Sequence, residues 1–294
     1  MGGAVHDEVI AERRHLLSLA FRMLGTVAEA EDAVQETYIR WYRLAQQERD
    51  RIDSPRGWLT RAASRVCLDM LCSARARHEQ YVGPWLPEPV PAAAFGANAG
   101  ADPLDRVTLD DTISSALLMV LESLTPAERV VFVLHDVFAA SFPEIAETVG
   151  RSPAACRQLA TAARRKVRDT PTRQVTRQEH DSVVQAFAAA TRSGELGRLI
   201  AVLDPSAVLR SDGGGIVTAA RNPVLGADHV ARFILGVLQK RPEVEVLEQE
   251  TNDGLGFAMW VEGRIIGVIT LEVADGLVSD VKMMLNPIKL SLWN

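Results

Sequence analysis

The sequence predicts a multidomain protein in which two all-α helical domains precede an α+β domain with a curved antiparallel sheet. Three observations predict this fold class. Up to about residue 168, apolar residues recur at helical spacing and helices begin with capping signals. A proline-rich stretch, YVGPWLPEPV at 81–90, divides these helices into two groups. Beyond residue 178, two helical patterns are followed by strand-like alternation with hairpin turns.

The first helical domain is expected over residues 1–80. Gly25 is typical of a helix end, and a capping box from Thr26 to Glu29 begins the next helix. Ser54 followed by proline at the first helical position begins a third helix, which runs to about Arg77. The second helix buries an apolar face, and its polar face includes Asp32, Gln35, Glu36 and Arg40.

A proline-rich linker is expected over residues 81–107. Its three prolines within 84–89 exclude a regular helix, because each removes a backbone donor and disfavours helix in the preceding residue. A merely solvated linker would not need the large apolar side chains that this one carries. We therefore expect the linker to dock on a neighbouring domain, the C-terminal one in the first place, through Tyr81, Trp85 and Leu86.

The second helical domain is expected over residues 108–170. Capping boxes that start at Thr125 and Ser141 begin two of its helices. The helix over 142–149 is short and ends at Gly150, and a three-residue turn leads to a longer helix. Helix, tight turn and second helix form the helix-turn-helix arrangement.

The second helix of this motif has one apolar face and one face rich in Arg and Gln. Arg and Gln can pair with base edges in the major groove of DNA, and Arg and Lys further along can neutralise phosphates. The alternative is a helical hairpin with a solvated Arg face. The candidate DNA-binding residues are Ser152, Ala154, Arg157, Gln158, Thr161, Arg164, Arg165 and Arg168.

The α+β domain is expected over residues 178–294, with helices at 179–192 and about 226–240. Turn signals divide 243–285 into four strands joined by short hairpins; they are Asn252-Asp253-Gly254, Glu262-Gly263 and Asp275-Gly276. Four residues of this domain could act as acid or base, namely Asp228, His229, Glu250 and Asp280. Nothing in the sequence pairs them with a nucleophile or a metal ligand, so we expect caps or surface groups, no catalytic residue and no enzyme.

The net charge of −6 argues against a free-standing nucleic-acid binder, because such proteins are usually basic. Two segments of the chain carry a charge of the opposite sign to this net charge. Residues 151–177 hold eight Arg and Lys against one acid, and residues 56–77 hold five Arg against one acid. Two basic segments in an acidic chain indicate local phosphate contacts without indiscriminate DNA binding.

The three cysteines, Cys67, Cys72 and Cys156, have no metal-binding spacing, so we expect free thiols in a reducing cytoplasm, no metal and no cofactor. No apolar run approaches the ~18 residues of a membrane span. The first residues lack the basic start and apolar core of a secretory signal. We expect a cytoplasmic protein with no membrane partner.

Three segments carry a family resemblance: AEDAVQETYIRWYR, SPRGWLTRAASRVCLDMLC and the helix-turn-helix, in that order. They resemble regions two and four of bacterial sigma-70 factors of the extracytoplasmic-function group. YVGPWLPEPV, DGGG at 212–215 and NPIKL at 286–290 resemble the subgroup that carries a SnoaL-like domain after region four. That subgroup commonly has a basic residue after DGGG and Asp in the terminal motif. This chain has Ile216 and Ile288, which leaves the function of those two charges open here.

The resemblance implies roles for the candidate residues. Asp32, Gln35, Glu36 and Arg40 would dock on core RNA polymerase. The opened −10 element of a promoter would contact Arg56, Trp58, Arg61 and Arg65, although for Trp58 a core position is favoured. The helix-turn-helix would recognise the −35 element of promoter DNA. A SnoaL-like domain is a cone with a pocket at its open end, and the resemblance implies that the C-terminal cone modulates these modules in cis. Whether its pocket holds an unknown small ligand stays open.

Two other functions are compatible with parts of the sequence. One is a stand-alone helix-turn-helix regulator that senses a small molecule in the cone. The other is a metabolic enzyme with DNA-binding helices. The segment EDAVQETY and the first three helices discriminate, because an operator-binding regulator has no use for them.

Overall fold

The computed structural model describes residues 9–78, 81–92, 115–169 and 175–294. These residues belong to two units. Of the described residues, 9–78 and 117–169 form the first unit, and 81–92, 115–116 and 175–294 form the second. The linker after residue 80 therefore groups with the C-terminal domain and not with the helices on either side of it. Expectations for residues 93–107 and 108–114 lie outside the described residues.

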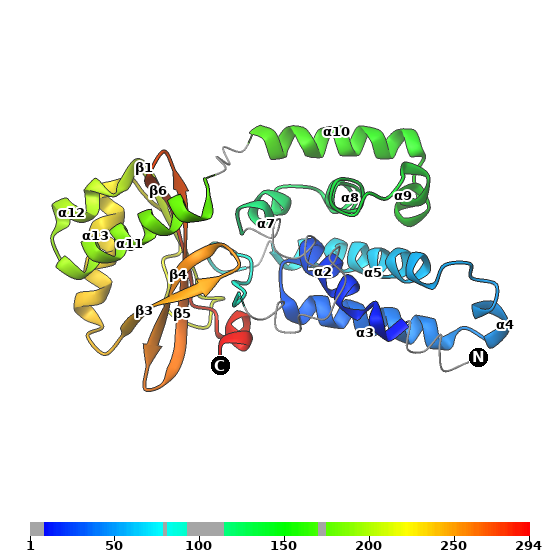
Figure 1. The fold of residues 1–294 in the computed structure, drawn as a ribbon, viewed down its shortest axis with the longest axis horizontal. Helices are drawn as coiled ribbons and strands as arrows, with labels where there is room; N and C mark the ends of the chain where they lie inside the picture. The colour runs from blue at the N-terminus through cyan, green and yellow to red at the C-terminus, as the bar shows by residue number, and fades with distance from the viewer. Residues whose placement is uncertain (1–8, 79–80, 93–114, 170–174) are drawn as a thin grey trace. The chain divides into compact units, whose positions relative to one another are not determined.

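The first four helices of the first unit are α2 (Arg13–Leu24), α3 (Val27–Arg43), α4 (Gln46–Arg49) and α5 (Pro55–His78) (Figure 1). Gly25 ends α2 in the left-handed region with φ +81°, and the Thr26 side chain caps α3 by accepting from the Glu29 amide. α2 and α5 both pack on α3. At their centre Trp41 is 1% exposed, and its ring meets that of Trp58 edge-on with centroids 5.2 Å apart.

The other helices of this unit are α7 (Ser115–Glu122), α8 (Pro126–Phe132), the π-helix η1 (Val133–Val137), α9 (Phe142–Val149) and α10 (Pro153–Asp169). α9, a turn at Gly150 with φ +68°, and α10 form the expected helix-turn-helix. α5 contacts both α8 and α9, so the two helical groups share one unit. Arg129 of α8 joins them, because its buried guanidinium donates to the Met23 carbonyl oxygen at 2.9 Å.

The second unit is built on a six-stranded sheet with the order β2-β1-β6-β5-β4-β3. All neighbouring strands are antiparallel except β1 and β6, which are parallel. The strands are β1 (Leu203–Asp212), β2 (Val224–Leu225), β3 (Glu245–Thr251), β4 (Gly254–Val261), β5 (Arg264–Ala274) and β6 (Leu277–Met284). Its helices are α11 (Arg177–Ser193), α12 (Leu196–Ala201), α13 (Ala227–Lys240) and the 3-10 helix η2 (Pro287–Trp293).

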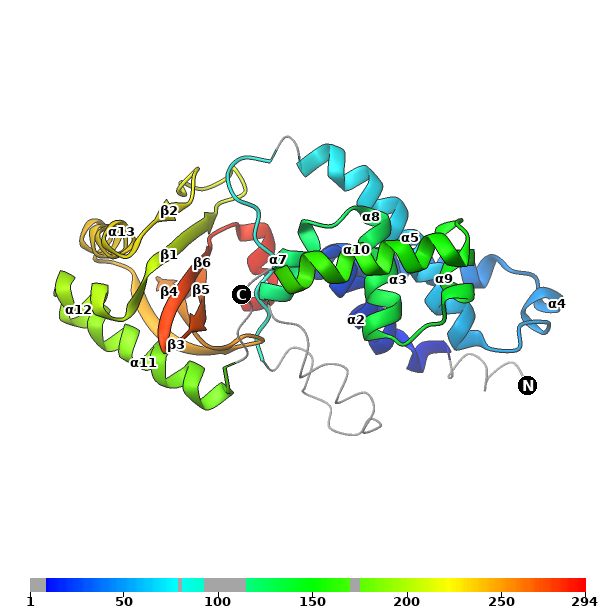
Figure 2. The same cartoon turned by 90° about the horizontal axis from the view of Figure 1, so that it is seen from above.

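The two faces of this sheet are covered differently. Figures 1 and 2 show α11, α12 and α13 on one face and η2 on the other. The core beneath α11 and α13 includes Phe187, Leu209, Ile234, Leu271 and Val281. Residues 81–92 run beside η2 on the second face (Figure 2). Because strand side chains alternate, one strand can contribute to the helical core and to the linker side.

The α+β fold class and the four predicted strands are confirmed as β3 to β6. The three hairpin turns lie where their Asn-Asp, Glu-Gly and Asp-Gly signals predict. The sequence did not predict β1 or its parallel pairing with β6. The segment LDPSAVLRSD contains proline and little alternation, and its partner lies about 70 residues further along the chain. Among the described helices, none is long and apolar enough to cross a membrane.

We expect Trp41→Ala to lower the free energy of unfolding of the helical unit by about 3–5 kcal/mol, because it leaves a large cavity between α2, α3 and α5. Urea unfolding followed by far-UV circular dichroism measures the loss. Tyr42→Ala is the matched control, since Tyr42 follows Trp41 in the sequence and its own side chain is 45% exposed. Equal effects of the two substitutions would contradict the assignment of Trp41 as the centre of this core.

Candidate nucleic-acid interface and linker clasp

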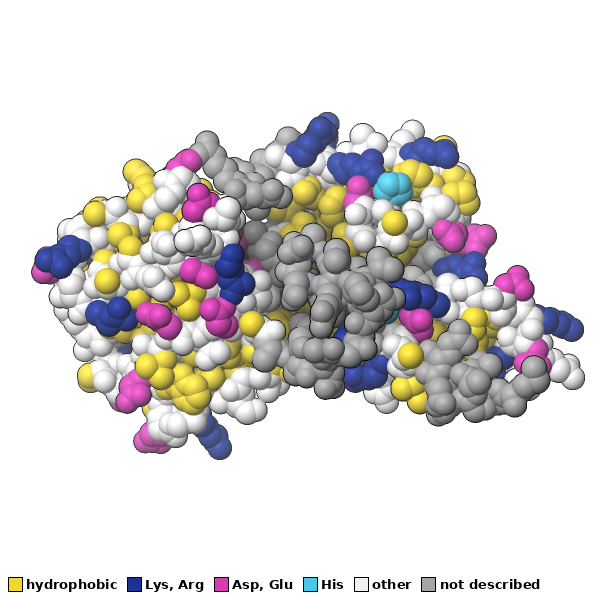
Figure 3. Space-filling view, viewed as in Figure 1, with side chains coloured by type: hydrophobic (Ala, Val, Ile, Leu, Met, Phe, Trp, Pro, Cys, Tyr) yellow, Lys and Arg dark blue, Asp and Glu magenta, His cyan; other side chains and the backbone are white. Residues whose placement is uncertain are grey.

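The outer face of α10 carries most of the candidate DNA-binding side chains. Ser152 caps the helix by accepting from the Ala155 amide at 3.2 Å. Arg157 lies over the Phe142 ring of α9, with its guanidinium carbon 5.4 Å from the ring centroid. Figure 3 shows dark blue side chains along the edge of the molecule formed by α10. The exposed members of the predicted set are Ser152, Ala154, Arg157, Gln158, Thr161, Arg165 and Arg168.

Arg164 differs from the rest of this set. Its Nε donates to Asp136 at 2.7 Å, and its Nη2 lies 3.0 Å from Nδ1 of His135. Both partners belong to η1, so Arg164 ties α10 to η1, which precedes α9 in the chain. An arginine whose guanidinium is already paired is less available to a phosphate than Arg165 or Arg168.

All three arginines among the four candidate residues of α5 have partners. Arg56 lies 3.5 Å from the Glu12 carboxylate, and its Nη2 lies 3.3 Å from Nδ1 of His15. Arg61 forms an ion pair with Glu147 of α9 at 3.1 Å. Arg65 donates to the carbonyl oxygen of Thr148 at 2.9 Å, near the negative end of the α9 dipole. The helix-turn-helix therefore contacts two of the arginines that the sequence analysis assigned to DNA. The Trp58 ring packs on Trp41 and is only partly buried.

The candidate polymerase-binding residues lie together on α3. Asp32 and Gln35 are exposed, and Glu36 pairs with Arg40 at 2.8 Å. Sequence reasoning missed two apolar neighbours on this helix, Ile39 and Tyr42, which are 37% and 45% exposed. Their large side chains next to charged ones were the available signal. Mixed apolar and polar surface of this kind is typical of protein-protein interfaces.

Asp212 forms the centre of a second site, in the C-terminal unit, which we call the linker clasp. It consists of Tyr81, Trp85, Leu86, Asp212, Asn286 and Lys289. The Asp212 carboxylate is fully buried, and each oxygen accepts two hydrogen bonds. Oδ1 accepts from the Tyr81 hydroxyl at 2.6 Å and from the Gly214 amide at 3.0 Å. Oδ2 accepts from the Leu86 amide at 2.9 Å and from Lys289 Nζ at 2.8 Å.

Lys289 completes the clasp with its buried ammonium group. Besides Asp212, it donates to the Leu86 carbonyl oxygen at 2.6 Å. Its Nζ also lies 4.0 Å from the centroid of the Trp85 ring, a cation-π contact. An aromatic face, a backbone carbonyl and a carboxylate thus surround one ammonium ion. This is the environment in which the linker tryptophan lies.

Tyr81 links the clasp to the terminal motif. Its hydroxyl donates to Asp212 and accepts from the Asn286 side-chain amide at 3.0 Å. Burial raises the pKa of the Tyr81 hydroxyl, and the hydrogen bond to Asp212 raises it further. Gly214 has φ +62°, and a Cβ there would collide with the Asn286 side chain. Only glycine lets Asn286 approach this turn.

The rest of the linker is also bound to the C-terminal domain. Residues 86–90 are buried. Trp293 Nε1 donates to the Pro89 carbonyl oxygen at 2.8 Å, and Val90 exchanges hydrogen bonds with Asn252. Pro91 forms an isolated bridge with Thr251 at the end of β3. The linker is therefore held along its described length, from Tyr81 to the edge of the sheet.

The residues considered as acid or base candidates do not come together. Asp228 pairs with Arg232, Glu250 with Arg177 and Asp280 with Arg210, while His229 lies 3.0 Å from the Leu225 carbonyl oxygen. Within the described ranges, no group of three or more His, Cys, Asp or Glu could hold a metal ion. Cys67 and Cys156 are buried free thiols and Cys72 is exposed.

Comparison with known proteins agrees with this arrangement. The family model for sigma-70 region 2 matches residues 9–77, and that for sigma-70 region 4 matches 114–167. The ECF RNA polymerase sigma factor SigJ of Mycobacterium tuberculosis is 43% identical over 236 residues, covering 80% of this chain and 73% of SigJ. The chain belongs to the ECF RNA polymerase sigma factors.

Two further comparisons extend the similarity over nearly all of this chain. The probable ECF sigma factor SigI of M. tuberculosis is 37% identical over 290 residues, covering 96% of this chain and 94% of SigI. A crystal structure of M. tuberculosis SigJ superposes with a TM-score of 0.74 at 37% identity, covering 97% and 98% of the two chains. In this sigma factor, α3 and α5 belong to region 2, and α9 and α10 belong to region 4.

We expect Lys289→Met to destabilise the C-terminal unit by about 3–5 kcal/mol, because it leaves the Asp212 carboxylate buried without its counter-charge. Thermal unfolding and limited proteolysis of the linker measure the effect. Lys240→Met, at the exposed end of α13, is the control. A linker as resistant in Lys289→Met as in Lys240→Met would contradict the clasp.

Proposed function

We propose that this sigma factor directs core RNA polymerase to its promoters and that its C-terminal domain modulates this activity in cis by holding the linker between regions 2 and 4. One observation carries the proposal. The linker that joins the two helical modules is bound by a buried Asp212–Lys289 pair of the C-terminal domain. Because regions 2 and 4 are tethered through this segment, its attachment limits how far they can separate.

The modules have distinct roles in the proposal. The α3 face with Asp32, Gln35, Glu36 and Arg40 binds core polymerase. The start of α5, with Arg56, Trp58, Arg61 and Arg65, binds the opened −10 strand, and Trp58 serves mainly as packing. The exposed face of α10 binds the −35 duplex, with Arg157 and Gln158 toward the bases, Arg165 and Arg168 toward phosphates, and Arg164 as a positioning residue.

The contact of α9 with α5 opposes −10 binding. Glu147 and the Thr148 carbonyl oxygen bind the guanidinium groups of Arg61 and Arg65. The phosphates of the −10 strand would bind the same two groups. An exposed ion pair contributes only about 0–1 kcal/mol, so it does not close the factor on its own. A held linker raises the effective concentration of α9 near α5, and a released linker lowers it. The clasp thereby controls a weak contact.

We propose a regulatory and not an enzymatic role for the C-terminal domain. The dispersed positions of Asp228, His229, Glu250 and Asp280, each with its own partner, support this. As a sigma factor the protein works with RNA polymerase, and we place it in the cytoplasm. The acidic net charge of −6 suits a factor that relies on polymerase to hold it on DNA.

Run-off transcription with core RNA polymerase tests the primary function. We expect the purified protein to confer start-site selection that core polymerase lacks. Asp32→Arg should reduce transcription at least tenfold, because a charge reversal at the α3 interface costs more than about 1.4 kcal/mol. Glu245→Arg, an exposed acid on β3, is the control. A protein that selects no start site with polymerase but protects an operator alone would be a stand-alone regulator.

Glu147→Gln should raise run-off transcription by up to about fivefold, because it weakens the hold of α9 on Arg61 by a fraction of the ~1 kcal/mol of an exposed pair. Glu195→Gln is the matched control, since Glu195 forms an equally exposed ion pair with Arg198 in the C-terminal domain. Transcription that falls in Glu147→Gln, or rises equally in both variants, argues against competition between α9 and DNA.

Trp85→Ala should loosen the linker, because Lys289 loses its aromatic partner. We expect faster proteolysis within residues 81–92 and higher run-off transcription than wild type. Val82→Ala, a substitution in the same linker at a side chain that is 51% exposed, should change neither. The proposal fails if Trp85→Ala leaves both cleavage and transcription at wild-type levels.

A further inference from the structure

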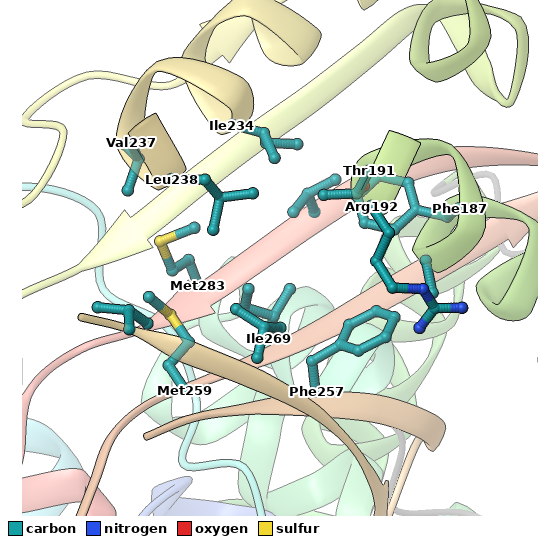
Figure 4. A pocket seen from close by; sticks show the side chains of 14 residues that line it. Phe187, Thr191, Arg192, Ile234, Val237, Leu238, Phe257, Met259, Ile269 and Met283 are labelled. Carbon is teal, nitrogen blue, oxygen red and sulfur yellow. The ribbon is translucent and has the colours of Figure 1, made fainter. Parts of the chain in front are cut away.

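The helical face of the C-terminal sheet encloses a cavity of about 240 Å³. Figure 4 shows side chains from α11, α13 and the sheet pointing into it. Its walls are apolar and include Phe187, Ile234, Phe257, Met259 and Met283. An apolar cavity of ~150 Å³ can stay dry and bind a benzene-sized molecule. This one can accept a ring with a short chain, or an acyl chain of similar bulk.

Two polar side chains lie at one end of the cavity. Figure 4 places Thr191 and Arg192 there, with Arg192 extending beside Phe257, whereas Met259 and Met283 lie toward the other end. The Thr191 hydroxyl is buried and has no hydrogen-bond partner among the described residues. The hydroxyl oxygen is not accessible from the cavity in this side-chain position, so it meets an acceptor there only after the side chain rotates. The cost of a buried polar group without a partner favours that rotation.

Arg192 is the only charged side chain among the described residues that line the cavity. It is 68% exposed, and its contact with Glu248 is long, at 3.6 Å. A guanidinium group at the mouth of an apolar cavity can bind a carboxylate through two parallel hydrogen bonds, and a weak pair with Glu248 can be displaced.

We infer that the cone binds a small apolar carboxylic acid. The ring or acyl chain lies between Phe257 and Met283, and the carboxylate pairs with Arg192. After rotation of the Thr191 side chain, a carboxylate oxygen also accepts from its hydroxyl. No Asp, Glu, His, Lys or Cys is among the described lining residues. The acid is therefore bound as a ligand and not turned over by proton transfer.

The same strands connect this cavity to the linker clasp. Val281 and Met283 of β6 line the cavity, and the strand continues into Asn286 and Lys289 of the clasp. Val246 of β3 lines the cavity, while Glu250 further along β3 accepts from the Ala92 amide of the linker through its backbone. An occupied cavity can thus bias the clasp. This regulatory part rests on the proposed function, whereas binding itself does not.

Isothermal titration calorimetry of the full-length protein tests the binding site. The probes are 3-phenylpropionate and octanoate, with 3-phenylpropanol and 1-octanol as neutral analogues of matched size. We expect saturable binding of at least one acid, about tenfold tighter than its alcohol, because hydrogen bonds to a charged group are the stronger ones. Linker cleavage should also change in rate at saturating acid.

Four variants test the assignment of residues. Arg192→Gln should weaken acid binding about tenfold, and Thr191→Val should weaken it severalfold. Arg192→Gln should leave the affinity for the alcohols unchanged, because an alcohol has no charge to pair with the guanidinium. Val237→Phe should abolish binding by filling the cavity. Arg198→Gln, at a side chain 67% exposed on α12, is the matched control and should bind as wild type does.

Three outcomes would overturn the inference. They are no saturable binding of either acid, equal affinity for acid and alcohol, and unchanged acid binding in Arg192→Gln. Run-off transcription on the same preparation separates the two proposals. Transcription without acid binding refutes the ligand alone, and acid binding without transcription refutes the sigma-factor role while the ligand site stands.

Discussion

The carboxylate of Asp212 is buried away from water, and burial of a charge is costly unless all of its hydrogen-bonding capacity is satisfied. Four donors satisfy it, from Tyr81, Leu86, Gly214 and Lys289. They come from three segments that are far apart in the sequence. Loss of any one leaves an unsatisfied buried group, so the linker, the glycine turn and the C-terminal motif must come together or not at all. The position of the linker follows from this constraint.

A buried ion pair adds little net stability, because desolvation offsets much of its attraction, whereas removal of one partner is costly. The clasp therefore selects one path for the linker without making that path irreversible. The contact between α5 and α9 is of another kind, since Arg61 and Glu147 are exposed and their pairing is weak. Under the proposed function, a specific attachment at the linker governs a weak attachment at the DNA-binding surface. Weak contacts are those that DNA and polymerase can displace.

Local signals in the sequence predicted the helices well. The boxes at Thr26, Thr125 and Ser141 begin helices where expected, because each cap is satisfied within four residues. The turns of the four later strands are local as well. The parallel pairing of β1 with β6 was not predictable, since it depends on residues about 70 positions apart. The pairing of Arg61 with Glu147 is likewise tertiary, and so are three of the four hydrogen bonds to Asp212, the exception being that of Gly214. No spacing in the sequence indicates these long-range contacts.

This chain has isoleucine at two positions, 216 and 288, where the subgroup that it resembles commonly has charged residues. These positions show which side chains the linker clasp requires. Ile216 is 56% and Ile288 is 65% exposed, so neither side chain enters the buried set around Asp212. The backbone at the second position still takes part, because the Ile288 amide donates to the Asn286 side chain at 3.0 Å. The clasp is thus complete without a basic residue after the glycines and without an acid in the terminal motif. This chain therefore holds its linker with uncharged, exposed side chains at both positions.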